Sequence, residues 1–300
     1  MIIVGDKANN LCNRLFVYRD IIAASIELNH QVVNPFFEEY AKYFIGTRND
    51  ILCRFPGPQQ SLISPTPLGR KIARKLIHKA LTMLRHPDSF LARSLKMAFI
   101  SSGYETTLTN ASGEYDLGSK DFREIAKSNN LIVLTGPLFR VKTQDWVQKN
   151  ARTIRDYFEP VAPIRSTVDR NIHYARQRGS MIVGVHIRRG DYKFFVNGRF
   201  FYSHDQYAAI IRNVRNMLEG QSPVFILTSN EPIPEIHYYG LNAIAVNCSP
   251  MEDLYTLSNC DYLIGPPSTF SAWASFYGSV PRYTISDPQQ KPLIGDFRIG

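Results

Sequence analysis

The feature that most constrains the fold is an alternation of short apolar runs and amphipathic segments in the second half of the chain. A β-branched run occupies Met181–Ile187, and apolar residues then recur at helical spacing from Tyr207 to Leu218. Ser203 and Gln206 predict a capping box at the start of that helix. Further strands are predicted at 224–227, 243–246, 261–264 and 282–285, and further helices at 249–258 and 269–277. This β-α-β-β-α-β-α-β order is typical of a parallel, nucleotide-binding α/β domain.

The first half follows the same pattern less regularly. A strand is predicted at Ile2–Val4, a helix from Leu11 to Ile26, and a later strand at 131–134. Four prolines predict a loop over residues 55–69, and two basic helices are expected after it.

The chain of 300 residues is long enough for two domains. Pro160 and Pro163 precede a predicted helix at 165–177 that leads into the second sheet. We therefore expect domains at 1–162 and 163–300.

The composition is that of a globular protein without membrane spans. No apolar run approaches the roughly 18 residues that a spanning helix needs, and the first residues lack the layout of a signal peptide. Cys12, Cys53, Cys248 and Cys260 are scattered with no Cys-x-x-Cys pair, so neither a disulfide framework nor a zinc site is expected. We expect a cytoplasmic protein with reduced thiols.

The net charge of +9 is concentrated in one segment. Between Arg70 and Lys96 lie eight basic residues and a single acid, Asp88. Such a segment fits nucleic acid, an anionic membrane or an anionic substrate, and a solvated helix face is the plain alternative. Basic residues at 70, 71, 74, 75 and 79 alternate with apolar ones at 72, 73, 76, 77, 80 and 81, so a helix here has a basic face beside an apolar face. This pattern favours peripheral contact with the anionic inner face of a membrane over nucleic-acid binding.

The strongest chemical signal is Gly184-Val-His-Ile-Arg-Arg-Gly-Asp-Tyr192. A strand ending at Ile187 delivers charged residues to the edge where open α/β sheets bind ligands. Adjacent arginines at a strand end point to different sides, so one can face a ligand while the other anchors the loop. Guanidinium groups bind phosphate in a two-pronged geometry that lysine cannot match. The plain alternative is an Arg-Asp pair that closes the turn at Gly190.

Two further motifs are typical of anion or ligand sites. In Gly265-Pro-Pro-Ser-Thr-Phe-Ser-Ala-Trp273, two hydroxyl residues begin a helix, where free N–H groups favour a phosphate. Simple capping by Ser268 or Thr269 is the alternative. In Leu11-Cys-Asn-Arg-Leu-Phe-Val-Tyr18, Asn13 either binds a ligand or caps the helix.

Together these motifs resemble the α-1,2-fucosyltransferases and the wider fucosyltransferase superfamily, whose members carry His-x-Arg-Arg-x-Asp. That motif stands here as His186-Ile-Arg188-Arg189-Gly-Asp191, with Tyr192 following as in bacterial α-1,2 members. The family's later pattern is matched by Asp253-Leu254, Ser258-Asn-Cys260 and Ser268-Thr-Phe-Ser271 with Trp273. Its N-terminal Gly-Asn-Gln-Met-Phe-Gln-Tyr is matched in part, because Asn13, Phe16 and Tyr18 are kept but Cys12 and Arg14 replace Gly and Gln. The family's Ser-Asp-Asp is Thr228-Ser229-Asn230 here, and residues 31–130 match no family pattern.

The resemblance implies a GT-B-like α/β fold of two facing Rossmann-like domains, with an acceptor-side domain at 1–162 and a GDP-sugar-binding domain at 163–300. It implies GDP-fucose as donor, a glycan ending in galactose as acceptor, and no further cofactor. His186 and Asp253 would read the guanine, and Arg188 would contact the β-phosphate. The remaining donor-binding residues that it implies are Asn13, Arg189, Ser268 and Thr269.

The implied reaction inverts the anomeric centre, because fucose is β-linked in GDP-fucose and the family's products are α-linked. Departing GDP gains negative charge, which other transferases neutralise with a metal held by Asp-x-Asp, and the sequence contains no Asp-x-Asp. Arg188 and a helix N-terminus can neutralise that charge instead, so we expect a metal-independent reaction. Asp191 is the candidate base for the acceptor hydroxyl, and its alternative role is to fix Arg188 or Arg189.

Three other functions compete with this interpretation. Nucleic-acid binding through residues 70–96 predicts an affinity that falls steeply with salt. A metal-dependent hydrolase would use His186, Asp191, His204 and Asp205, which lack the spacing of helical zinc motifs. Within the superfamily, α-1,6 or protein O-fucosyl transfer competes with the α-1,2 linkage that Tyr192 and the Ser-Thr-Phe-Ser pattern favour.

Overall fold

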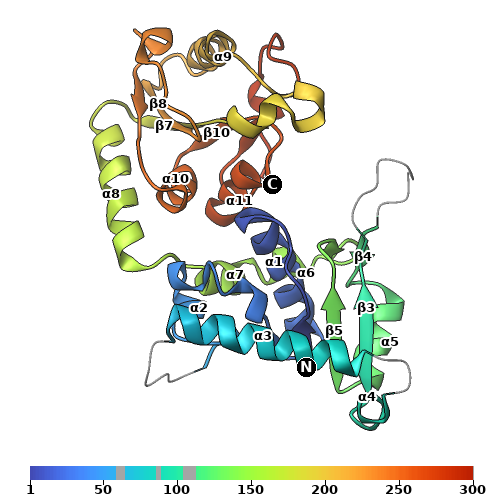
Figure 1. Cartoon of the computed structure of the whole chain (residues 1–300). Coiled ribbons are helices and arrows are strands. Elements are labelled where there is room, and N and C mark those ends of the chain that lie inside the picture. The colour runs from blue at the N-terminus through green and yellow to red at the C-terminus, as the bar shows by residue number, and fades with distance from the viewer. Residues whose placement is uncertain (59–64, 86–88, 104–112, 300) are drawn as a thin grey trace. The chain divides into compact units, whose positions relative to one another are not determined.

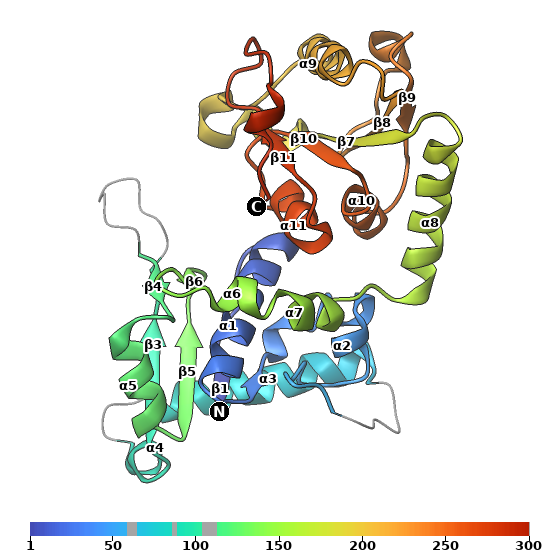
Figure 2. The same ribbon diagram turned by 180° about the vertical axis from the view of Figure 1, so that it is seen from behind.

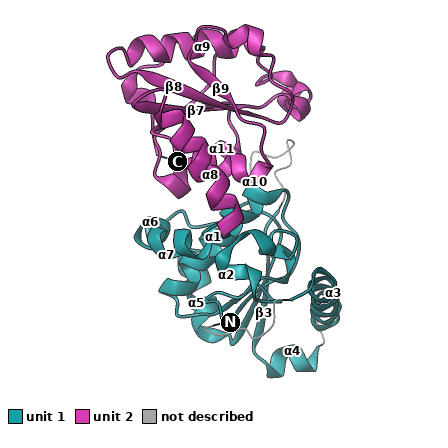
Figure 3. Cartoon of the chain, turned by 90° about the vertical axis from the view of Figure 1, so that its left-hand side faces the viewer, with its two compact units in different colours: residues 1–161 teal, residues 162–300 magenta. Residues whose placement is uncertain are grey.

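The structure is a computed structural model that describes residues 1–58, 65–85, 89–103 and 113–299 (Figure 1). The chain divides into two compact units, Met1–Val161 and Ala162–Gly300 (Figure 3). Each unit is an α/β structure around a parallel sheet. In the described part of the chain, no helix is both long enough and apolar enough to cross a membrane.

Unit 1 is built on a four-stranded parallel sheet with the order β2-β1-β5-β3. These strands are β1 (Ile2–Val4), β2 (Val32–Val33), β3 (Met97–Ser101) and β5 (Leu131–Thr135), and a separate ladder pairs β4 (Tyr115–Asp116) with β6 (Phe139–Arg140). The helices are α1 (Leu11–Glu27), α2 (Ile45–Arg48), α3 (Pro67–Leu84), α4 (Phe90–Ser94), α5 (Lys120–Ser128), α6 (Trp146–Lys149) and α7 (Ala151–Tyr157).

An aromatic core holds α1 in unit 1. Tyr18 of α1 packs edge-on against Phe37, Tyr157 and Phe158, with ring centroids 5.4, 5.7 and 5.5 Å away. The hydroxyl groups of Tyr18 and Tyr157 also share a hydrogen bond of 2.9 Å. These contacts fix the helix whose first turn carries Asn13.

Unit 2 is built on a five-stranded parallel sheet with the order β11-β10-β7-β8-β9. Its strands are β7 (Met181–Ile187), β8 (Pro223–Ser229), β9 (Ala243–Ala245), β10 (Tyr262–Gly265) and β11 (Arg282–Thr284), and its helices are α8 (Ala162–Arg176), α9 (His204–Met217), α10 (Pro250–Leu257) and α11 (Thr269–Gly278). The predicted element order is confirmed, as are the capping boxes at the starts of α9 and α10. All four cysteines are free, as expected.

Alternate residues of β7 face two different layers. Val183, Val185 and Ile187 pack into the core beneath α9. On the other face α10 comes so close that a Cβ on Gly184 would lie 2.7 Å from Leu257 Cδ2, so any larger residue would force that side chain to shift. His186 shares the Gly184 face by the period of two and is directed toward α10 and α11. Figures 1 and 2 show α9 on one side of this sheet and α10 and α11 on the other.

The strand order of unit 2 reverses between β7 and β10. The chain runs outward from β7 to β8 and β9, and then crosses back to β10 and β11. The connections that leave β7 and β10 therefore pass to opposite faces, through α9 and α11 respectively (Figure 1). In open parallel sheets, ligands bind outside the carboxyl ends of the strands at this reversal point.

Candidate active site

Both motifs of the second half leave the sheet at the reversal point. β7 ends at Ile187 and leads into the two arginines, and β10 ends at Gly265 and leads over two prolines into α11. The strands lie so close that a Cβ on Gly265 would be 3.1 Å from the Cβ of His186. The structure thus brings the His-x-Arg-Arg-x-Asp motif and the Ser-Thr start of α11 to one edge of the sheet.

His186 is a buried, neutral imidazole at this edge. Its ring lies against Phe270 of α11, with the centroids 4.9 Å apart. Burial, followed by the positive charges of Arg188 and Arg282, lowers the pKa of His186 to about 3. Within the described residues its Nδ1 has no hydrogen-bond partner. The ring therefore keeps one nitrogen available for a ligand.

Asp253, in the first turn of α10, is a second buried group with an open position. Burial, followed by the negative charge of Glu252, raises the pKa of Asp253 to about 7. Its Oδ1 has no hydrogen-bond partner in the described part of the chain, and the same holds for Arg188 Nε and Thr228 Oγ1. Buried polar groups in proteins are nearly always bonded, so a set of open positions at the carboxyl edge of a parallel sheet indicates a ligand site.

Arg188 is held in place with donors to spare. Its Nη2 donates to Asp191 Oδ2 at 2.8 Å, and its Cζ lies 5.6 Å from the centre of the Tyr192 ring. Tyr192 is fixed in turn, because its hydroxyl donates to the main-chain oxygen of Pro267. The guanidinium is therefore oriented for an anion. Asp191 has the geometry of its alternative role, fixing Arg188, and its role as a base stays a prediction.

Arg189 points to a different environment although it is adjacent to Arg188. Its Nη1 donates to the main-chain oxygen of Tyr202 at 2.6 Å, and its Cζ lies 4.4 Å from the centre of the Phe201 ring. Its Nε lies 3.4 Å from Glu231 Oε2, and its amide donates to Asn230 Oδ1 at 3.1 Å. These contacts anchor the loop after β7, and the predicted contact of Arg189 with a donor stays a prediction.

The start of α11 is capped and has a second cation behind it. Ser268 Oγ accepts from the amide of Phe270 at 3.2 Å, which is the capping role, and Thr269 is exposed at the first helical position. Arg282, which sequence reasoning missed, donates to Ser271 Oγ at 3.0 Å and to the main-chain oxygen of Ser268 at 3.5 Å. Burial lowers the pKa of Arg282, and within the described residues no carboxylate pairs with it.

Asn13 belongs to unit 1, where it lies partly exposed in the first turn of α1. The N-cap residue is Asn10, so the alternative that Asn13 caps this helix is wrong. Arg14 is buried, and its Nε donates to the main-chain oxygens of Ala8 and Asn9 at 3.0 and 2.8 Å. The arginine therefore fixes the polar loop before α1, and the predicted donor contact of Asn13 stays a prediction.

The segment after the first motif exposes aromatic side chains that the sequence did not single out. It forms two short 3-10 helices, η3 (Gly190–Lys193) and η4 (Phe195–Gly198). Phe194 and Phe195 are 79% and 49% exposed, and the Phe195 ring stacks on Tyr192 at 5.0 Å. Val196 is in the left-handed region (φ 48°), which is strained for a β-branched residue. An exposed, strained segment beside Arg188 and Tyr192 is typical of ligand-binding loops.

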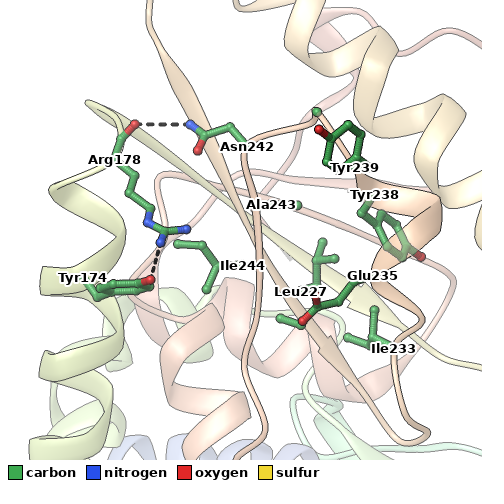
Figure 4. Close-up of a pocket in the computed structure, with 12 residues that line it drawn as sticks. Tyr174, Arg178, Leu227, Ile233, Glu235, Tyr238, Tyr239, Asn242, Ala243 and Ile244 are labelled. Carbon is green, nitrogen blue, oxygen red and sulfur yellow. Dashed lines mark hydrogen bonds between the residues drawn. The ribbon is translucent and has the colours of Figure 1, made fainter.

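A separate cavity of about 480 Å³ lies beside β9, the edge strand of the unit 2 sheet (Figure 4). Tyr174 in the last turn of α8 and Arg178 just beyond that helix line it together with Tyr239 and Asn242. Asn242 Nδ2 donates to the main-chain oxygen of Arg178 at 3.2 Å. None of the predicted site residues lines this cavity, so it is distinct from the site at the reversal point.

The residues of the hydrolase alternative do not come together. His186 faces α11, whereas His204 Nδ1 contacts the Tyr238 hydroxyl at 2.8 Å on the α9 side of the sheet. Asp205 Oδ1 lies 2.7 Å from His237 Nδ1. Over the ranges that the structure describes, no three His, Cys, Asp or Glu side chains are grouped closely enough to hold a metal ion.

Residues 145–289 match the sequence model of glycosyl transferase family 11. This region is just under half of the chain and contains every predicted site residue except Asn13. No curated protein matches the sequence at a significant level. The family match supports the predicted glycosyltransferase.

Solved structures of fucosyltransferases share the fold of the chain. NodZ from Bradyrhizobium aligns with a TM-score of 0.55 and 16% identity over 96% of both chains. A mutant of Arabidopsis thaliana FUT1 in complex with GDP aligns with a TM-score of 0.56 and 12% identity over 97% of this chain and 71% of that one. POFUT1 in complex with GDP-fucose aligns with a TM-score of 0.52 and 12% identity over 97% of this chain and 96% of that one. The predicted α/β, GT-B-like fold is confirmed.

Proposed function

We propose that the chain is an inverting fucosyltransferase that transfers fucose from GDP-fucose to a galactoside, forming an α-1,2 linkage without a metal ion. The observation that carries the proposal is the set of open polar positions at the reversal point of unit 2: His186 Nδ1, Asp253 Oδ1 and Arg188 Nε. The family match over this region supports it, as does the fold shared with proteins solved in complex with GDP and GDP-fucose.

Asp253 and His186 fit the base of the nucleotide. Guanine presents N–H donors beside a carbonyl acceptor, and a carboxylate accepts from such donors. Asp253 supplies the buried carboxylate, and His186 supplies a neutral ring with one nitrogen free. Because its pKa is about 7, Asp253 is protonated at lower pH, and it must lose this proton before it can accept hydrogen bonds from both guanine N–H groups.

Arg188 and the start of α11 fit the diphosphate. As GDP departs, negative charge grows on its oxygens, and donors already oriented toward that charge lower the barrier. Arg188 is oriented by Asp191, and Ser268 and Thr269 begin a helix whose N-terminus is positive. We propose Asp191 as the base that takes the proton of the acceptor hydroxyl.

The two units divide the substrates in this proposal. Unit 2 binds GDP-fucose, and unit 1 binds the glycan acceptor that ends in galactose.

The experiment that tests the function is incubation of the chain with GDP-fucose and a panel of galactosides, followed by determination of the product linkage. An α-1,2-fucosylated galactoside is the expected product. A product linked α-1,6, the activity named for NodZ, or a fucosylated protein would replace the α-1,2 assignment while keeping the donor. Absence of transfer to every acceptor, together with absence of GDP-fucose binding, would contradict the proposal.

A further inference from the structure

Helix α3 has an inner face that is bound to unit 1 and an outer face that is exposed. Figure 3 shows α3 and α4 at the periphery of unit 1. The inner face of α3 is tied down by Arg70, which is buried and donates to the main-chain oxygens of Thr47 and Arg48 at 3.1 and 2.6 Å. Arg74 Nε lies 2.7 Å from Glu38 Oε1. The sequence placed both arginines on an exposed basic face, and this is wrong because they hold the helix to its own unit.

The outer face of α3 carries a row of exposed apolar side chains. Leu68, Ile72, Leu76 and Met83 are 67%, 49%, 64% and 69% exposed. Their spacing of four, four and seven residues places them on one side of the helix. Apolar side chains scattered singly over a surface are ordinary, whereas a continuous row marks a contact surface. Ile72 and Leu76 belong to the apolar face that the sequence predicts for this helix, and both are exposed.

A row of lysines runs beside the apolar row. Lys71, Lys75 and Lys79 repeat every four residues and are all exposed. Helix α3 contains no acidic residue, and over the described residues these lysines have no ion-pair partner. At 100° per residue, Lys71 and Lys75 border the apolar row on one side, and Lys79 lies within its angular range, four residues before Met83. This combination is typical of helices that lie in the interface of an anionic membrane, with the apolar side chains among the acyl chains and the lysines among the headgroups.

We infer that the outer face of α3, formed by Leu68, Ile72, Leu76 and Met83 with Lys71, Lys75 and Lys79, docks on an anionic lipid bilayer. Charge complementarity distinguishes a bilayer from the two other partners that could cover this face, a second copy of the chain and nucleic acid. A second copy of the chain would bring two rows of unpaired lysines together, and nucleic acid would leave the apolar row against phosphates. A bilayer with anionic headgroups satisfies both rows at once. The inference is independent of the fucosyltransferase proposal, because it uses no residue of unit 2.

The test is co-sedimentation of the full chain with phosphatidylcholine vesicles that contain or lack phosphatidylglycerol. Binding is expected only with phosphatidylglycerol, and we expect it to weaken as salt is added. The variant Lys71→Gln/Lys75→Gln/Lys79→Gln should bind about 100-fold more weakly, given the contribution of each basic residue near such a surface. The matched control is Lys42→Gln/Lys120→Gln/Lys127→Gln, which removes the same charge from exposed positions elsewhere on unit 1 and should bind much like the unmodified chain.

A second variant, Ile72→Ser/Leu76→Ser, tests the apolar row without changing charge, and it should also lower vesicle binding. Both positions are exposed, so the far-ultraviolet circular dichroism and the melting temperature should stay unchanged. Failure of the unmodified chain to bind phosphatidylglycerol vesicles at low salt would overturn the inference, as would equal losses in the lysine variant and its control. A monomer–dimer equilibrium that Ile72→Ser/Leu76→Ser abolishes would instead identify a second copy as the occupant.

Discussion

At the scale of single residues, adjacent arginines at the end of β7 have different environments. Arg188 pairs with an exposed carboxylate and keeps its Nε open, whereas Arg189 is bound to the main chain of Tyr202 and to Glu231. A guanidinium beside an open site is suited to a two-pronged contact with a phosphate, and lysine offers only a point charge. The two positions should therefore respond differently to the same substitution.

Arg188→Lys should lower kcat by two orders of magnitude or more while leaving the fold intact. The expected loss is about 3 kcal/mol of barrier, the effect of removing one donor oriented toward developing charge. The measurement is steady-state turnover of GDP-fucose, with thermal melting as the check on folding. Arg189→Lys is the matched control. Its contacts are with the loop, so this variant should have a lower melting temperature and a kcat close to that of the unmodified protein. Near-normal turnover in Arg188→Lys would remove this residue from the site.

The raised pKa of Asp253 predicts that stability and donor binding depend on pH in opposite directions. Its pKa is about 7 in the folded protein against an ordinary value of 3.8, so the folded state binds the proton more tightly than the unfolded state. Asp253 therefore contributes its full share to the free energy of unfolding below the ordinary pKa. That contribution is lost as pH rises toward 7. Asp253→Asn removes this loss, so at pH 8 the variant should be more stable than the unmodified protein by at least about 1 kcal/mol.

Donor binding should respond to the same carboxyl in the opposite direction. The affinity for GDP should be highest above pH 7 and fall as pH drops below 7, because a protonated carboxyl accepts fewer hydrogen bonds. Asp253→Asn should bind GDP about 10- to 100-fold more weakly, the cost of losing a hydrogen bond to a charged group, and should show little of this pH dependence. Neighbouring Glu252, whose own pKa is lowered, stays ionised over this range. Calorimetric titration and melting curves at several pH values check both effects, and equal GDP affinity in the two proteins would contradict the assignment.

At the scale of elements, the η3–η4 segment is the part of the site with the most exposed aromatic surface. Phe195 stacks on Tyr192, whose ring lies under the Arg188 guanidinium. This loop lies beside Arg188 in the unit that binds the donor, so we expect it to contact the fucose: Phe195→Ala should raise the KM for GDP-fucose several-fold and leave the Kd for GDP unchanged, because the ring contributes apolar contact area. Phe195→Tyr keeps the ring and should behave as the unmodified enzyme. Titration of GDP-fucose at saturating acceptor measures the effect, and an unchanged KM in Phe195→Ala would place the fucose elsewhere.

The sequence predicted the elements of unit 2 well because each has a local signal. The β-branched run of β7 has the predicted bounds, and the capping boxes of α9 and α10 place those helix starts. In unit 1, β2, β4 and β6 have two residues each, too few for an alternating pattern. The strand β3 follows Lys96, which turns the chain with a positive φ although no glycine or proline marks the turn.

The same difference decides which site residues could be found. His186, Arg188 and Ser268 follow predicted strands, and parallel strands bring their carboxyl ends to one edge. Arg282 had no such signal, because it begins an edge strand and its guanidinium turns back under α11. Its position depends on tertiary packing that no local pattern encodes. Phe194 and Phe195 were missed for a related reason, since no local pattern marks these aromatic residues as exposed or the backbone at Val196 and Asn197 as left-handed.

At the scale of the whole molecule, two groups of basic residues stand out within the net charge of +9. One is the lysine row of α3, which is exposed and unpaired over the described residues. The other lies at the edge of the unit 2 sheet, where Arg188 is only partly balanced by Asp191 and Arg282 has no carboxylate partner in the described part of the chain. Anionic groups are therefore favoured at both places, and the second lies beside the open positions of His186, Arg188 and Asp253.

That second group leads to a prediction about metal ions. Transferases that use a divalent metal neutralise the leaving diphosphate with an ion held by acidic residues, and the sequence has no Asp-x-Asp to hold one. Arg188, the positive end of α11 and the half-buried Arg282 place fixed positive charge at the same edge, and a guanidinium does not lose its proton at any working pH. Turnover of GDP-fucose should therefore be unchanged in excess EDTA and should not rise on addition of Mg²⁺ or Mn²⁺. A metal-dependent glycosyltransferase assayed in parallel shows that the chelator is sufficient. Loss of activity in EDTA that Mg²⁺ or Mn²⁺ restores would contradict the metal-independent mechanism.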